Sequence, residues 1–207
     1  MDIKTLEKRV LNDIANARES FNIIKDFVDP IFQKSDEHHR HRDWPLTAHI
    51  LRAAVDSVIC SLGRLLQPNA RRSECTLLKY KNEVIKKIKE KEHKSGTSSY
   101  SVENAEKLKD REYVNSINKK TVDYQKKIFP IRDQLVSHSD MGFNWINSDS
   151  ILPILSECIG FTENLHRTCH SALDDAGMVG EYISPLSKEV ADDWINCLLK
   201  RQKRKVK

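Results

Sequence analysis

The sequence predicts an all-α protein, a helical bundle with long antiparallel helices. Apolar residues recur every three or four positions along several long stretches, which is the period of an amphipathic helix. No segment shows the convincing polar-apolar alternation of a β-strand, and the 207 residues include only six glycines and six prolines to interrupt helices. With 39% hydrophobic and 31% charged residues, the composition excludes a membrane-spanning or wholly disordered chain. We expect one domain over residues 1–199, followed by a disordered basic tail over residues 200–207.

The first predicted helix runs from Ile3 to the Asp29-Pro30 pair, where proline ends the pattern. Its apolar positions alternate spacings of three and four and form a heptad-like seam: Leu6, Val10, Ile14, Ala17, Phe21, Ile24 and Val28. A seam of this kind packs either against an antiparallel helix of the same chain or against a second subunit. The pattern leaves both alternatives open.

Residues 34–43 (KSDEHHRHRD) have no apolar period and predict a solvated loop. The segment also holds His38, His39 and His41, which would bind a metal only if the fold brought their side chains together. The second helix is predicted to open at Trp44-Pro45 and to close at Pro68-Asn69.

The remaining helices follow from the same period. Residues 74–95 predict a third helix with a thin apolar stripe and a run of lysines from Lys79 to Lys94, most simply a solvated face although lysines also contact phosphates. The stretch from Gly96 to Ser101 is the best internal linker, and a fourth helix continues from there toward Ile128. Two more helices are predicted over residues 151–173 and from residue 185 to about residue 199.

The cysteine and histidine patterns favour neither disulfides nor a metal site. The five cysteines are odd in number and widely spaced, with no CxxC pair and no secretory segment, so we expect a reducing cytoplasmic location and mostly buried thiols. They are Cys60, Cys75, Cys158, Cys169 and Cys197. His166 and His170 share a helix face, but Arg167 beside them is unfavourable for a cation and the glutamate of a zinc-protease motif is missing. We expect no metal and no cofactor.

One segment, residues 129–140 (FPIRDQLVSHSD), carries side chains suited to catalysis. Cleaving RNA without a metal requires a group that moves protons at the 2′-hydroxyl and the leaving 5′-oxygen, together with positive charge on the transition state. His138 changes protonation near neutral pH, and the Arg132 guanidinium can bind two phosphate oxygens at once. On an ideal helix these two residues lie roughly 120° apart around the axis and about 9 Å along it. A local distortion, or a two-fold axis that places two copies of the segment face to face, would bring the groups together.

This segment resembles the signature of the HEPN superfamily, in which an arginine followed by a polar residue precedes a histidine after four to six intervening residues; here the gap is five. The string Arg132-Asp133-Gln-Leu-Val-Ser-His138-Ser-Asp140 looks most like the abortive-infection U-type branch of that superfamily. The resemblance implies a helical bundle that dimerises and, in active members, a metal-independent endoribonuclease of phage-defence or toxin-antitoxin systems. It implies that Arg132 and His138 are the catalytic pair and that Asp133 is the polar neighbour. Ser137 and Asp140 stand beside the pair as supporting positions.

The expected partners are RNA, a second copy of the chain, and an antitoxin or defence partner protein, with no membrane. Six of the last eight residues are basic, and we expect the tail to contact RNA phosphates through Lys200, Arg201, Lys203 and Arg204. The alternative function is a non-catalytic helical dimer that binds RNA or a partner protein. In that alternative Arg132 and Asp133 pair on a helix surface, and His138 ends the helix.

Overall fold

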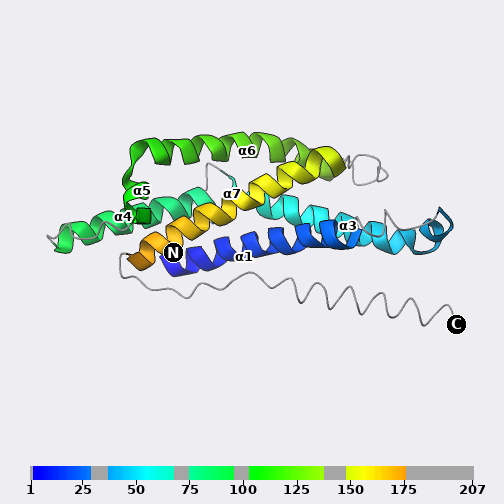
Figure 1. Ribbon diagram of the computed structural model, residues 1–207, viewed down its shortest axis with the longest axis horizontal. Helices are drawn as coiled ribbons and strands as arrows, with labels where there is room; N and C mark the ends of the chain where they lie inside the picture. The colour runs from blue at the N-terminus through cyan, green and yellow to red at the C-terminus, as the bar shows by residue number, and fades with distance from the viewer. Residues whose placement is uncertain (1, 29–36, 68–74, 96–102, 138–147, 176–207) are drawn as a thin grey trace.

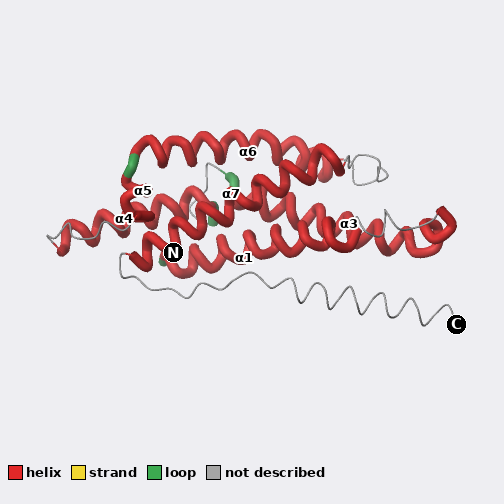
Figure 2. Tube along the Cα trace, in the orientation of Figure 1, coloured by secondary structure: helices red, strands yellow, loops and turns green. Residues whose placement is uncertain are grey.

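The computed structural model describes residues 2–28, 37–67, 75–95, 103–137 and 148–175. Within these ranges the protein is all-α with no strand, as the sequence predicted (Figure 2). No helix in these ranges is both long enough and apolar enough to cross a membrane.

Long helices packed side by side form the bundle (Figure 1). Helix α1 (Ile3–Asn22) lies antiparallel to α3 (Glu37–Leu65), and α4 (Leu77–Ser95) continues in the direction of α3. The short α5 (Glu103–Lys109) then leads into α6 (Arg111–Ser137), which lies antiparallel to α7 (Ser148–Asp175). Helix α7 contacts α1, α3, α4 and α5, and α3 packs between α1 and α6.

The apolar seam of the first helix is buried against other helices of the same chain. Its members from Leu6 to Ile24 are all buried, and they pack against α3, α4 and α7. Of the two alternatives for the seam, the antiparallel partner within the same chain is therefore the one observed. At its start the helix is capped by Asp2, whose Oδ1 accepts hydrogen bonds from the backbone N–H groups of Lys4 (2.9 Å) and Thr5 (3.1 Å). After Asn22 the helix widens into a π-helical segment, η1 (Ile23–Val28).

Two apolar clusters form the core. One cluster joins the N-terminal half of α1 to α4, α5 and the C-terminal half of α7, with Leu65 of α3 and Ile117 of α6. Tyr80 and Leu108 are fully buried in it. The other joins the C-terminal half of α1 to α3, the end of α6 and the N-terminal half of α7, with Leu62 and Ile128 fully buried. Because the second cluster includes α6 only near its C-terminal end, it anchors the helix segment that carries the candidate catalytic arginine.

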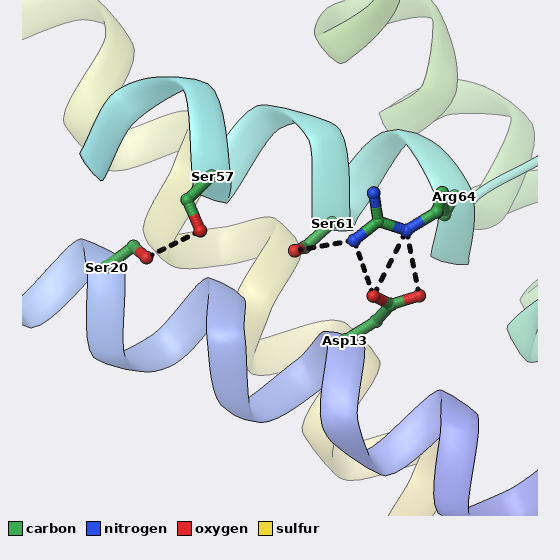
Figure 3. A network of polar contacts seen from close by, with 5 residues as sticks. All are labelled: Asp13, Ser20, Ser57, Ser61 and Arg64. Carbon is green, nitrogen blue, oxygen red and sulfur yellow. Dashed lines mark hydrogen bonds and ion pairs between the residues drawn. The ribbon is translucent and has the colours of Figure 1, made fainter. Parts of the chain in front are cut away.

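Polar contacts align the helices around this core (Figure 3). The Arg64 guanidinium of α3 donates to both carboxylate oxygens of Asp13 on α1 at 2.6 to 3.1 Å, and the hydroxyls of Ser20 and Ser57 meet at 2.8 Å. Such bonds between facing helices favour one axial register over its neighbours.

The predicted start of the second helix at Trp44-Pro45 is wrong. Helix α3 begins at Glu37, so most of the expected loop over residues 34–43 is helical and Trp44-Pro45 lies inside the helix. An apolar period predicts only those helical segments that face a core. The charged first turns of α3 carry no such period. The side chains of His38, His39 and His41 lie outside the described residues.

The predicted fourth helix differs in two ways. It is interrupted at Asp110, whose carboxylate accepts the backbone N–H of Glu112 at 2.9 Å and thereby caps the start of α6. Helix α6 then continues through Pro130 to Ser137, beyond the expected end near Ile128. Pro130 is exposed, as is Lys126, whose carbonyl loses its helical donor there, so water can replace the missing bond.

The remaining helices agree with expectation where the structure describes them. Helix α4 occupies most of residues 74–95, and α7 contains residues 151–173. Cys158 and Cys169 are buried as predicted, Cys75 is half-buried and Cys60 is exposed. The linker over residues 96–101, the helix from residue 185 and Cys197 lie outside the described residues, as do Lys200, Arg201, Lys203 and Arg204 of the tail.

Candidate active site

Arg132 and Asp133 lie together in the last turns of α6. The two side chains form an ion pair in which Nη2 and Nε of Arg132 donate to Oδ1 of Asp133 at 2.9 and 3.1 Å. Both are accessible, with 36% of the Arg132 side chain and 65% of the Asp133 side chain exposed. An exposed ion pair of this kind contributes little free energy to stability. A phosphate that binds Arg132 in place of Asp133 therefore loses little free energy by breaking the pair.

Two neighbours position the Arg132 side chain. Its guanidinium carbon lies 4.2 Å from the centre of the Phe129 ring, one helical turn earlier, within cation-π range. Its aliphatic stem lies against α3 at Gly63, where an added Cβ would sit 3.6 Å from Cδ of the arginine. The guanidinium is thus held at the surface by packing on Phe129 and α3, while its edge reaches solvent.

The other predicted site residues follow directly in the sequence. Ser137 is the last residue of α6, although its side chain lies outside the described residues. His138 and Asp140 lie outside them as well, so the structure does not bring Arg132 and His138 together or separate them.

A second set of polar side chains is buried in the opposite half of the bundle and was not predicted as a unit. Oε1 of Glu7 on α1 accepts hydrogen bonds from the Tyr80 hydroxyl of α4 and from Nδ1 of His170 on α7, each at 2.7 Å. Nε2 of His166 lies 3.6 Å from the same oxygen, and its ring stacks on those of Tyr80 and His170. The i, i+4 spacing of the two histidines was visible in the sequence, but nothing in the pattern around Glu7 marked it as their partner.

This cluster has the features of a structural network. The His166 side chain is 2% exposed, and burial lowers its pKa to about 4, an effect that Glu7 only partly offsets. Nearby, Nζ of Lys81 donates to Oδ1 of Asn118 at 2.6 Å, and burial lowers the pKa of this lysine. Lys81 therefore does not belong to the basic face predicted for residues 79–94. Throughout the described chain, no group of three or more histidine, cysteine, aspartate or glutamate side chains is arranged to hold a metal ion.

The lowered pKa of His166 predicts a pH-dependent stability. In the unfolded chain this histidine titrates near 6.5, whereas in the fold it stays neutral down to about pH 4. Between these values the unfolded state binds more protons, so stability must fall as the pH falls, by about 2 kcal/mol between pH 7 and pH 5. Urea unfolding across this range measures the effect. The charged and titratable groups that act on the ring are Glu7, His170 and Arg167. The control is His166→Gln, in which the pH dependence of stability should flatten.

No protein-family model, curated protein or solved structure matches this chain.

Proposed function

We propose that this protein is a metal-independent endoribonuclease of the HEPN type that acts in phage defence or in a toxin-antitoxin system. The main support for the proposal is Arg132, which lies near the C-terminal end of α6 with its guanidinium accessible. Its side chain packs on Phe129 and pairs with Asp133. An all-α bundle and the sequence string from Arg132 to Asp140 support the same function.

In the proposed reaction the RNA supplies its own nucleophile. His138 takes the proton of a ribose 2′-hydroxyl, the 2′-oxygen attacks the adjacent phosphorus, and the bond from phosphorus to the 5′-oxygen breaks. The imidazolium formed on His138 then gives this proton to the leaving 5′-oxygen. Arg132 binds the non-bridging oxygens, on which charge accumulates in the transition state. The products are a 2′,3′-cyclic phosphate and a 5′-hydroxyl, and Asp133 orients the guanidinium.

The proposed site is composite and belongs to a homodimer whose two-fold axis lies near residues 130–140. The helical seam of α1 no longer supports this dimer, because its residues from Leu6 to Ile24 are buried within one chain. Over the described surface, Ile23 is the sole large hydrophobic side chain that is exposed. The proposed interface lies instead at the end of α6, where Arg132 and Asp133 are accessible.

Cleavage of RNA in the presence of EDTA tests the proposal. We expect purified protein to cut RNA in EDTA at the rate found without it, because no step uses a metal ion. The fragments should carry 2′,3′-cyclic phosphates, detected by mass spectrometry, and 5′-hydroxyls that polynucleotide kinase can label. Loss of cleavage in EDTA, or 5′-phosphate products, would contradict this chemistry. Intact RNA under every condition would favour the alternative, a non-catalytic helical dimer.

A further inference from the structure

A groove lined by polar and charged side chains includes neither Arg132 nor Asp133 of the candidate active site. It has a volume of about 610 Å³ and opens between α1, the C-terminal end of α3 and the start of α4. This volume falls within the range of ~300–1,000 Å³ that small-molecule sites occupy. The side chains that matter for its chemistry are Arg9, Asn12, Asp13, Asn16, Arg64 and Gln67.

Helix α1 lines the groove with a single face. Arg9, Asn12, Asp13 and Asn16 follow one another at spacings of three, one and three, so all four project to the same side of the helix. The apolar seam occupies the neighbouring face and fixes α1 against α3 and α7. The polar face is therefore held by packing that does not involve the groove itself.

Among the described residues that line the groove, two arginines accompany one aspartate, so their net charge is positive. The two arginines differ in mobility. Asp13 and Ser61 hold the Arg64 guanidinium by its edge, and the hydrogen bond to Asp13 raises the pKa of this arginine (Figure 3). Arg9 is exposed, and its Nη1 makes only a long contact of 3.7 Å with Sγ of Cys75 among the described atoms. Arg9 can therefore reorient toward an anion, whereas Arg64 offers a fixed planar group.

Three carboxamides also line the groove, from Asn12 and Asn16 on α1 and from Gln67 just after α3, and Cys75 and Thr76 border it at the start of α4. Each carboxamide holds a donor and an acceptor side by side, which matches the paired donors and acceptors on the edge of a nucleobase. Inorganic phosphate offers mostly acceptor oxygens and would engage few of the amide oxygens. The combination of amides with arginines thus selects a ligand that joins a hydrogen-bonding heterocycle to an anion.

We propose that this groove is a nucleotide-binding site. Arg9 binds the phosphate, the amides of Asn12, Asn16 and Gln67 read the base edge, and the base stacks on the planar guanidinium of Arg64. The nucleotide is either a free mononucleotide or one unit of an RNA strand, since both present the same groups. This inference goes beyond the proposed ribonuclease activity and holds whether or not the chain cleaves RNA.

Isothermal titration calorimetry on the full chain tests the site. The probes are each of the common nucleoside 5′-monophosphates, inorganic phosphate, and a short 2′-O-methyl oligoribonucleotide, which lacks the free 2′-hydroxyl needed for cleavage. We expect at least one nucleotide probe to bind with a Kd below about 1 mM and phosphate to bind more weakly at the same ionic strength. Binding of a monophosphate identifies a free nucleotide as the source, and binding of the oligonucleotide alone identifies an RNA strand.

Matched variants assign the binding to the groove. Arg9→Gln and Asn16→Ala should each raise the Kd by about tenfold, since each removes a hydrogen bond to the ligand. The controls are Arg111→Gln and Asn115→Ala on α6, which change the same side-chain types at exposed positions away from the groove and should shift the Kd by less than about twofold. All four positions are exposed, so the variants should retain the circular dichroism of the parent protein.

Three results would overturn the proposal: no binding of any nucleotide probe, equal binding of phosphate and nucleotide, or equal loss of affinity in the groove and control variants. RNA cleavage is measured separately on the same variants. Cleavage without nucleotide binding in the groove would reject this site alone, and groove binding without cleavage would reject the ribonuclease proposal alone.

Discussion

Replacing His138 with alanine should lower the rate of RNA cleavage by about 10²- to 10⁴-fold, because the variant lacks the group that moves protons to and from the RNA oxygens. Cleavage of a fluorescent RNA in EDTA measures the loss. The matched control is His49→Ala, which removes an exposed histidine from α3 and should leave the rate unchanged. A His138→Ala variant that cleaves RNA at the normal rate would refute the assignment.

Arginine 132 provides a second arm of the same experiment. Arg132→Lys keeps the positive charge but loses the two-pronged binding of phosphate and the planar contact with Phe129, so it should also be inactive. Asp133→Asn should be milder, since the position then keeps a polar partner for Arg132. Because both side chains are accessible, Arg132→Lys and Asp133→Asn should melt within a few degrees of the parent protein.

Mixing inactive variants tests whether the site is shared between subunits. If one subunit supplies Arg132 and its partner supplies His138, a mixed dimer of Arg132→Lys and His138→Ala contains one intact site. Random exchange of equal amounts should then restore about a quarter of the parent activity. A site completed within each chain predicts no recovery, and a strictly monomeric protein by light scattering at micromolar concentration would exclude the shared site.

Replacing Glu7 with alanine should lower the free energy of unfolding by about 3 kcal/mol, the largest effect on stability that we expect from a polar residue. Its carboxylate accepts hydrogen bonds from Tyr80 and His170, and the change leaves both donors without that acceptor inside the bundle. Urea unfolding at pH 7 measures the difference. Glu7→Gln keeps an acceptor oxygen and should lose less.

The control for this change is Glu112→Ala, at an exposed position in the first turn of α6, which should cost less than about 1 kcal/mol. A Glu7→Ala variant as stable as this control would show that the cluster contributes nothing to folding. RNA cleavage by folded Glu7→Ala should be normal, since Glu7 belongs to the half of the bundle opposite the end of α6.

The sequence alone determined the helical class and most of the core. Leu6, Val10 and Ile14 are buried where the period of three and four placed them, because a regular apolar stripe must be covered whatever the topology. The Arg132 to His138 string was noticed through its resemblance to the HEPN signature, and its catalytic role stays a prediction.

Only the tertiary structure decided which surfaces meet. An apolar stripe on a helix does not specify which surface covers it. The packing of α1 on α3 shows that the seam is buried within one chain. The first turns of α3, from Glu37, carry no apolar period that could have predicted them. The cap at Asp110 depends on a local hydrogen bond, which leaves no apolar period either. The partnership of Glu7 with Tyr80 and His170 joins residues far apart in the chain. Burial of a polar group is favourable only when the fold supplies its partners, so no pattern in any single helix could have revealed it.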